Sequence, residues 1–261
     1  MKRSLLYITS IIVAILIIGS CSSEGDSFFS DSGSDTGQGG SMARFTISGD
    51  YLYTVDQSTL KTFGLSTPDK PQYLDGKDQL LSFNIETIFA MGDTLLFIGS
   101  QDGMYIYSIK NAGFPQYIST TSHIRSCDPV IASGNYAYIT LNSEGAWCGR
   151  GSNVLQIYDI SDPYKPEQVL EMGGFTGPRG LGIDGKKLFI CDNGLKVYDL
   201  TNPERPQYMD DLTEIQEVDN IDAYDVIPNN GVLLLVGKDG FFQFDYTGEK
   251  LRYLSEIPVI R

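Results

Sequence analysis

Histidine is almost absent from this chain of 261 residues, since His123 is the only one. One imidazole excludes metal sites built from several histidines and leaves a single such group for acid–base chemistry. The sequence also lacks a G-x-S-x-G motif, a phosphate-binding loop and an EF-hand-like calcium loop. We therefore expect no cofactor and no metal, and catalysis has little support.

Basic residues are scarce as well, with 19 lysines and arginines against 33 acidic residues. Removing residues 1–20 takes away Lys2 and Arg3, so 17 basic residues would stand against 33 acidic ones, a formal charge of −16. Binding to nucleic acid or to a phospholipid surface requires clustered lysine and arginine. The composition argues against both and suits a soluble domain outside the cytoplasm.

The chain has one long apolar run, Leu5 to Ile18, directly after Lys2 and Arg3. This run is shorter than the roughly 20 residues that span a bilayer as a helix, so we interpret residues 1–20 as a signal peptide. The residues Ile18-Gly19-Ser20-Cys21 resemble a bacterial lipobox. The resemblance implies that Cys21 carries acyl chains such as palmitate and becomes the new N-terminus.

Ser22, rather than Asp, follows Cys21, so an inner-membrane retention signal is missing. We expect a protein of the cell envelope that is anchored in the outer membrane, with surface exposure left open. Residues 21–42 are mostly Gly, Ser, Asp and Thr. Such a segment cannot bury enough surface to offset its ordering entropy, which predicts a flexible tether.

Sustained helical periodicity is missing from the rest of the chain, and what is present is a repeat of about 43 residues. The clearest copy is LKVYDLTNPERPQY, from Leu195 to Tyr208. Related segments begin at Leu60, Met104, Leu155 and Phe241. In the copy around Leu195, turn residues separate four short runs, 180–183, 187–191, 195–200 and 207–209, which predicts four antiparallel strands.

Four strands per repeat is typical of a β-propeller blade, so residues 43–261 predict an all-β propeller of five four-stranded blades. An open β-solenoid is the competing fold. We expect the ring to close by contact between residues 45–48 and 253–260. The segments LQIYD and LKVYD, each followed by a Ser/Thr-x-Pro-x-x-Pro turn, resemble the LVIVD repeat of bacterial lipoproteins. This resemblance implies a propeller outside the cytoplasm and supplies no catalytic residues.

One face of the predicted propeller carries a loop, NSEGAWCGRGSN from Asn142 to Asn153, that is longer than its counterparts and contains the only tryptophan. Lengthened loops on rigid scaffolds often bind ligands, and an aromatic ring beside polar groups suits sugars or peptides. A loop with no role in binding is the alternative. The expected binding face comprises Arg125, Asp128, Glu144, Trp147, Arg150, Arg179, Tyr224 and Asp225.

Two cysteines, Cys127 and Cys148, fall on this face within one repeat. Outside the cytoplasm such cysteines tend to pair, so we predict a disulfide between them. Cys191 occupies a strand position that is Gly or Thr in other copies, which predicts an inert buried thiol. The Asp159 and Asp199 turns cluster oxygen atoms, and turn capping explains them better than calcium does.

These features favour a non-enzymatic, lipid-anchored module that binds or scaffolds a protein or glycan partner. The alternative is a glycan-active hydrolase or lyase that uses carboxylates at the channel mouth, such as Asp128, Asp222 and Asp225. A purely structural envelope protein is a third reading.

Overall fold

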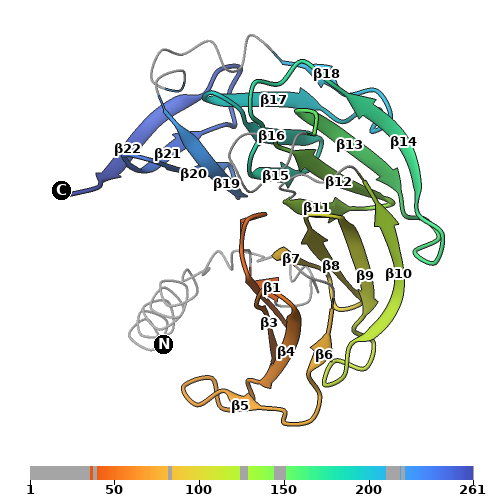
Figure 1. Ribbon diagram of the computed structural model, residues 1–261. Helices are drawn as coiled ribbons and strands as arrows, with labels where there is room; N and C mark the ends of the chain where they lie inside the picture. Colours follow the sequence, from red (N-terminus) through yellow and green to blue (C-terminus); the bar gives the residue numbers. More distant parts are fainter. Residues whose placement is uncertain are drawn as a thin grey trace, which may run out of the picture. The chain divides into compact units, whose positions relative to one another are not determined.

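A computed structural model describes residues 36–37, 40–81, 84–123, 129–143, 151–209, 218 and 221–260. Five antiparallel sheets follow one another in chain order around a common axis (Figure 1). The prediction of an all-β propeller with five four-stranded blades is therefore confirmed. No helix within the described ranges is long and apolar enough to cross a membrane.

The first strand of each sheet is the innermost, and the chain then runs outward through the blade (Figure 1). Blade 1 contains β2 (Phe45–Ser48), β3 (Tyr51–Val55), β4 (Thr59–Gly64) and β5 (Gln72–Tyr73), with β1 (Thr36–Gly37) paired to β2 and β6 (Gln79–Leu80) paired to β4. Blade 2 contains β7 (Ile85–Met91), β8 (Leu95–Ser100), β9 (Gly103–Ser108) and β10 (Gln116–Ser122). Blade 3 contains β11 (Val130–Ser133), β12 (Tyr136–Leu141), β13 (Val154–Asp159) and β14 (Glu167–Met172).

Blade 4 contains β15 (Leu181–Asp184), β16 (Lys187–Cys191), β17 (Leu195–Asp199) and β18 (Gln207–Tyr208). Blade 5 contains β19 (Ala223–Asn229), β20 (Val232–Gly237), β21 (Gly240–Asp245) and β22 (Arg252–Pro258). The four strands of blade 4 lie within about a residue of the runs that the sequence predicts.

The turns between strands use the residues that the repeat retains. Gly134 and Gly185, which follow the innermost strands of blades 3 and 4, have φ angles of 58° and 55°, a conformation that L-residues rarely adopt. Asp159 and Asp199 accept hydrogen bonds from the backbone N–H groups two residues later, at 2.8 and 2.7 Å. Hydrogen bonds from Ser161 lower the pKa of Asp159, and those from the Thr201 hydroxyl and N–H lower the pKa of Asp199. These bonds confirm turn capping as the role of the two aspartates.

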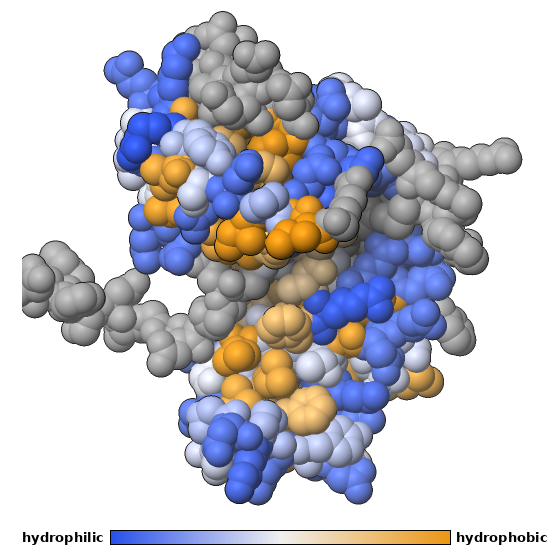
Figure 2. All heavy atoms as spheres, turned by 90° about the vertical axis from the view of Figure 1, so that its left-hand side faces the viewer, coloured by the Kyte–Doolittle hydropathy of each residue, from blue (hydrophilic) through white to orange (hydrophobic). Residues whose placement is uncertain are grey.

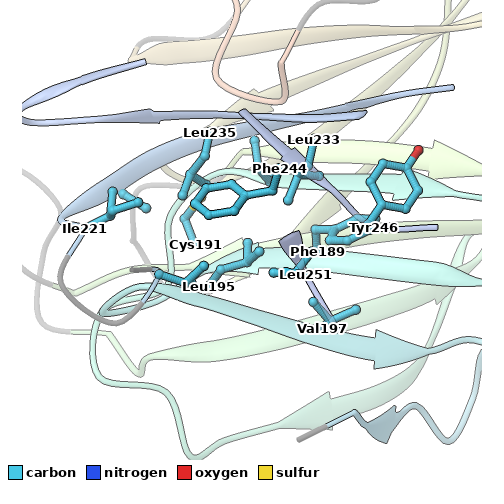
Figure 3. Packing of buried hydrophobic residues seen from close by; sticks show 13 residues of the cluster. Phe189, Cys191, Leu195, Val197, Ile221, Leu233, Leu235, Phe244, Tyr246 and Leu251 are labelled. Atoms are coloured by element: carbon cyan, nitrogen blue, oxygen red, sulfur yellow. The ribbon is translucent and has the colours of Figure 1, made fainter. Parts of the chain in front are cut away.

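Consecutive blades pack face to face. We call the face toward the next blade in chain order the forward face, and the opposite one the rear face. Figure 3 shows this packing between blades 4 and 5, where Phe189 and Cys191 of the forward face meet Phe244 and Tyr246 of the rear face. The rings of Phe189 and Tyr246 lie 5.1 Å apart. Cys191 is fully buried with a free thiol, and burial raises its pKa, so the prediction that this thiol is buried is confirmed.

The outermost strands are attached through aromatic pairs. In four blades a ring on the third strand contacts a tyrosine on the fourth, with centroids 5.3 to 5.8 Å apart. The pairs are Phe63–Tyr73, Tyr107–Tyr117, Tyr198–Tyr208 and Phe244–Tyr253. In blade 3 Gln168 takes the place of the tyrosine and accepts a hydrogen bond from the Tyr158 hydroxyl at 3.3 Å. The tyrosine that ends the repeat motif thus holds strands as short as two residues.

The ends of the propeller differ from our expectation. β22 pairs with β21, every residue of β22 is exposed, and Phe45 of β2 is 56% exposed, so the predicted closure by contact between residues 45–48 and 253–260 is wrong. Instead, the segment Gly40–Met42 ahead of β2 reaches blades 4 and 5 through hydrogen bonds of Ser41 and Met42.

Candidate functional site

The described part of the expected binding face lies where the chain enters the innermost strands of blades 4 and 5. Arg179 precedes β15, Asp222 precedes β19, and Tyr224 and Asp225 belong to β19. The innermost strands of adjacent blades run in the same direction and begin at the same end of the ring, which brings these residues together. We call Arg179, Asp222, Tyr224 and Asp225, together with Ser41, the rim cluster.

Arg179 is the cation of the rim cluster. Its Nη1 donates hydrogen bonds to Asp222 Oδ1 at 2.6 Å and to the carbonyl oxygen of Ala223 at 3.3 Å. The guanidinium also lies 5.1 Å from the centre of the Tyr224 ring, within the range of a cation–π interaction. Because the Arg179 side chain remains 29% exposed, a ligand can reach it.

Asp225 has a structural position beside this cation. Its carboxylate accepts hydrogen bonds from Ser41 Oγ at 3.1 Å, from the Met42 N–H at 3.3 Å and from its neighbour Val226 N–H at 3.0 Å. Burial raises the pKa of this carboxyl, while the hydrogen bonds act in the opposite direction. The bonds from Ser41 and Met42 hold the segment ahead of β2 against β19.

Two glycines make room for the Asp225 side chain. A Cβ on Gly40 would lie 1.9 Å from Asp225 Oδ2, and a Cβ on Gly180 would lie 2.2 Å from Asp225 Oδ1. The Gly180 N–H also donates to the Tyr224 carbonyl oxygen at 2.9 Å. The backbone therefore approaches Asp225 from blade 4 and from the segment ahead of β2 at distances that only glycine permits.

The loop before Arg179 is fixed by Asp192, whose side chain is 0% exposed. Asp192 accepts hydrogen bonds from the N–H groups of Thr176 and Gly177 at 2.9 and 2.7 Å, and it forms an ion pair with Lys196 at 2.6 Å. Thr140 of blade 3 donates to the Arg179 carbonyl oxygen at 2.5 Å. The backbone at Arg179 is thus fixed by Asp192 through residues 176–177 and by Thr140 through the Arg179 carbonyl group.

A cavity of about 440 Å³ lies along the axis and is lined by the innermost strands of all five blades. Phe45, Phe89, Ile131, Leu181 and Ile227 are among its lining residues, and Gly40 links it to the rim cluster. None of the described residues that line it has a titratable side chain, so this part of the lining suits an uncharged molecule. Within the described ranges, no group of three or more His, Cys, Asp or Glu residues is arranged to hold a metal ion.

The structure brings together three of the predicted site residues, namely Arg179, Tyr224 and Asp225. Cys21 and seven residues of the expected face and disulfide lie outside the described residues: Arg125, Cys127, Asp128, Glu144, Trp147, Cys148 and Arg150. Sequence reasoning missed Ser41, which it placed in the tether. The residues Gly39-Gly40-Ser41 directly ahead of the first blade could have indicated this contact, since paired glycines permit close backbone approach.

The fold and the repeat define a class of protein, a β-propeller of five blades that are copies of one repeated unit. Residues 124–172 match the family model described as the LVIVD repeat. The chain is therefore a β-propeller in which one segment, residues 124–172, matches the LVIVD repeat. A search of curated protein sequences found no match.

Solved structures share the fold at low sequence identity. A protein of unknown function from Desulfotomaculum acetoxidans matches with a TM-score of 0.63 and 14% identity, over 87% of this chain and 70% of that one. A Lactobacillus plantarum protein matches with a TM-score of 0.62 and 15% identity, over 80% and 69%. The periplasmic gluconolactonase PpgL of Pseudomonas aeruginosa matches with a TM-score of 0.59 and 15% identity, over 81% and 68%. At this identity the likeness concerns the fold alone.

Proposed function

We propose that the protein is a lipid-anchored module of the cell envelope that binds or scaffolds a protein or glycan partner without catalysing a reaction. Cys21 would carry the lipid and place the propeller at the outer membrane. The partner would be bound at the rim cluster and at the loop that contains Trp147.

The observation that carries this proposal is that the two carboxylates of the rim cluster are engaged in structural bonds, whereas its arginine is partly exposed. Asp225 accepts two hydrogen bonds that hold the segment ahead of β2 and a third from Val226, and Asp222 is paired with Arg179. Carboxylates used in this way stabilise the rim rather than act as acid or base. Arg179, in contrast, is a partly exposed cation on an aromatic ring, which suits recognition of an acidic group.

The chemistry of Arg179 indicates the kind of group that it would bind. A guanidinium has five N–H donors, and Nη1 makes both of the bonds to Asp222 and Ala223. A carboxylate or sulfate of the partner would compete with Asp222 for the same cation. Tyr224 supplies an apolar surface against which a sugar ring or an aromatic side chain can pack.

The test is cross-linking of intact cells that express the full chain, followed by quantitative identification of the attached proteins and glycans. Arg179→Gln and Trp147→Ala should each reduce the same partner at least tenfold. Arg252→Gln is the matched control, because Arg252 also pairs with a carboxylate, Asp245 at 2.7 Å, but lies on the outermost strand of blade 5. Equal partner recovery from all three variants would remove the rim from consideration.

The competing proposal is a glycan-active hydrolase or lyase with carboxylates of the channel mouth as acid and base. Such an enzyme needs two carboxyl groups placed on either side of the scissile bond. Turnover of envelope glycans by the full chain, lost in both Asp222→Asn and Asp225→Asn while the fold is retained, would favour this alternative over a binding module.

A further inference from the structure

Blades 1 and 5 each leave one face without a neighbouring blade. Innermost strands pack on one another at four boundaries, β2 on β7, β7 on β11, β11 on β15 and β15 on β19. At the remaining boundary, β22 is exposed throughout and Phe45 of β2 is 56% exposed. Within the described ranges, no blade therefore covers the forward face of blade 5 or the rear face of blade 1.

The forward face of blade 5 carries an apolar patch next to two polar residues, Gln243 and Ser255, which pair with each other beside Leu234. Cross-strand partners in an antiparallel sheet lie on the same face, so the pairing of Val236 with Phe241, and of Phe241 with Ile257, places all three residues together. Leu234 and Ile227 are paired with each other on this face. Phe241 is 54% exposed and Ile257 is 71% exposed.

The rear face of blade 1 is apolar in the same manner. Ile47 pairs with Leu52, Phe45 with Thr54, and Leu52 with Phe63. Leu65 directly follows β4. Figure 2 looks onto the side of the propeller where blades 1 and 5 lie, and hydrophobic residues gather there in an upper and a lower patch. Isolated apolar residues are normal on a surface, whereas two grouped patches indicate an interaction site.

The repeat shows what these faces fit. Phe241 occupies the position of Leu60, Met104, Leu155 and Leu195, as the pairing of each with the strand before it establishes. Those four side chains are 0 to 4% exposed, because each packs on the rear face of the next blade. Blade 5 therefore retains the residue type that a following blade would cover.

The rear face of blade 1 gives the same result. Leu52 corresponds to Leu96, Ala137, Leu188 and Leu233, which are all 0% exposed, whereas Leu52 is only partly buried. Phe63 and Leu65 correspond to residues that are 0 to 8% exposed in the other four blades. Both end blades thus keep apolar residues at these contact positions, although Gln243 and Thr54 stand where most other blades have Ile, Val or Leu.

We propose that the forward face of blade 5 docks on the rear face of blade 1 in a second copy of this chain. The second copy is the partner whose exposed face has the residue types that forward faces already pack against at four internal boundaries. The contact is head-to-tail, because it joins two different surfaces. If blade 5 of the second copy also docks on blade 1 of the first, both uncovered faces of each copy are buried.

The internal boundary between blades 4 and 5 specifies which residues should meet. Phe189 corresponds to Leu234, and Tyr246 corresponds to Leu65. Since the rings of Phe189 and Tyr246 lie 5.1 Å apart, Leu234 of one copy should contact Leu65 of the other. Cysteines at these two positions would then lie within reach of a disulfide.

The experiment uses two differently tagged full-length chains co-expressed in the same cells, one with Leu65→Cys and one with Leu234→Cys. After oxidation, we expect at least ten times more product that contains both tags than from a matched pair in which Val169→Cys replaces Leu234→Cys. Val169 is 36% exposed on β14 of blade 3, away from either open face. Adding Phe241→Glu should abolish the excess, whereas Val169→Glu should not.

Product with both tags at the level of the control pair would overturn the proposal. A third chain carries both Leu65→Cys and Leu234→Cys. If it forms a disulfide within one chain and no mixed product, blade 5 closes on blade 1 of the same molecule, and the proposal is wrong. An excess that survives Phe241→Glu would also contradict it, because the contact would then not use this face.

Discussion

Ser41 Oγ donates a hydrogen bond to Asp225 Oδ1 at 3.1 Å, although the two residues are 184 positions apart in the chain. The same oxygen accepts a hydrogen bond from the Leu181 N–H at 2.7 Å. One side chain ahead of the first blade therefore bonds to the innermost strands of blades 4 and 5. It joins the start of the propeller to its end where strand pairing does not.

Replacing Ser41 by alanine should lower the free energy of unfolding by about 1–3 kcal/mol, since it leaves the buried Leu181 N–H without its acceptor. Urea denaturation followed by circular dichroism measures the change. Ser255→Ala is the control, because Ser255 lies on the exposed strand β22 and donates a hydrogen bond to Gln243. This substitution should change the free energy of unfolding by less than about 0.5 kcal/mol. Equal effects from both variants would show that the Ser41 bridge has no special role.

Gly180→Ala should destabilise the protein by more than about 2 kcal/mol, because the new Cβ would lie 2.6 Å from Asp225 Cα and 2.7 Å from the Tyr224 carbonyl oxygen. Both are backbone atoms, so a side-chain rotation cannot relieve the clash. Gly173→Ala is the matched control, since a Cβ there has no atom within 4 Å. Thermal unfolding of the two variants should separate them clearly, and similar melting temperatures would contradict the close approach.

The stability that depends on Asp225 should fall as the pH rises. Burial raises its folded-state pKa above the unfolded value of about 3.9, so the folded protein binds the proton more tightly than the unfolded chain. This contribution is complete below about pH 3.9 and is lost as the pH passes through the raised pKa. Relative to wild type, Asp225→Asn should therefore gain stability between pH 4 and pH 7. A difference independent of pH would refute this assignment.

Asp245 should show the opposite dependence. Hydrogen bonds from Thr247 and the ion pair with Arg252 lower its pKa to about 2. Its contribution is therefore present above the unfolded pKa of about 3.9 and is lost as the pH falls toward about 2. Asp245→Asn should therefore lose less stability than wild type between pH 5 and pH 2. Urea unfolding midpoints across this range would show the difference. An unchanged acid slope would exclude this carboxyl as a source of that loss.

Tyr208→Ala should release the outermost strand of blade 4, which has only two residues and is held by the ring pair of Tyr198 and Tyr208 at 5.4 Å. We expect a loss of about 0.5–1.5 kcal/mol beyond the lost burial, together with faster hydrogen exchange at residues 207–209. Tyr164→Ala, which removes a tyrosine that is 73% exposed, should leave that exchange unchanged. Faster exchange in both variants would argue against the ring pair.

The predicted disulfide between Cys127 and Cys148 can be tested by thiol titration of the purified, lipidated chain. Before unfolding no thiol should react, because Cys191 is fully buried and its pKa is raised. After unfolding without reductant, one thiol should react. Three reactive thiols would show that the two cysteines are unpaired.

The blades could be predicted from the sequence because their signals are local. The turn glycines, the Asx turns at Asp159 and Asp199, and the alternation within each strand depend on residues that are close in the chain. The link between the start of the propeller and its last blade depends on a contact across 184 positions, between Ser41 and Asp225, and no local pattern reports it. The position of Arg179 was predictable from repeat register, but its pairing with Asp222 was not, because the two residues belong to different repeats.

Each blade has a forward and a rear face that resemble those of the other blades, so whole repeats can be added or removed as units. Because Phe241 and Leu52 are apolar like their internal counterparts, the duplication or the deletion of one whole repeat would still bring matching surfaces together. Descendants of such a chain can therefore differ in the number of repeats while the contacts inside each remain unchanged.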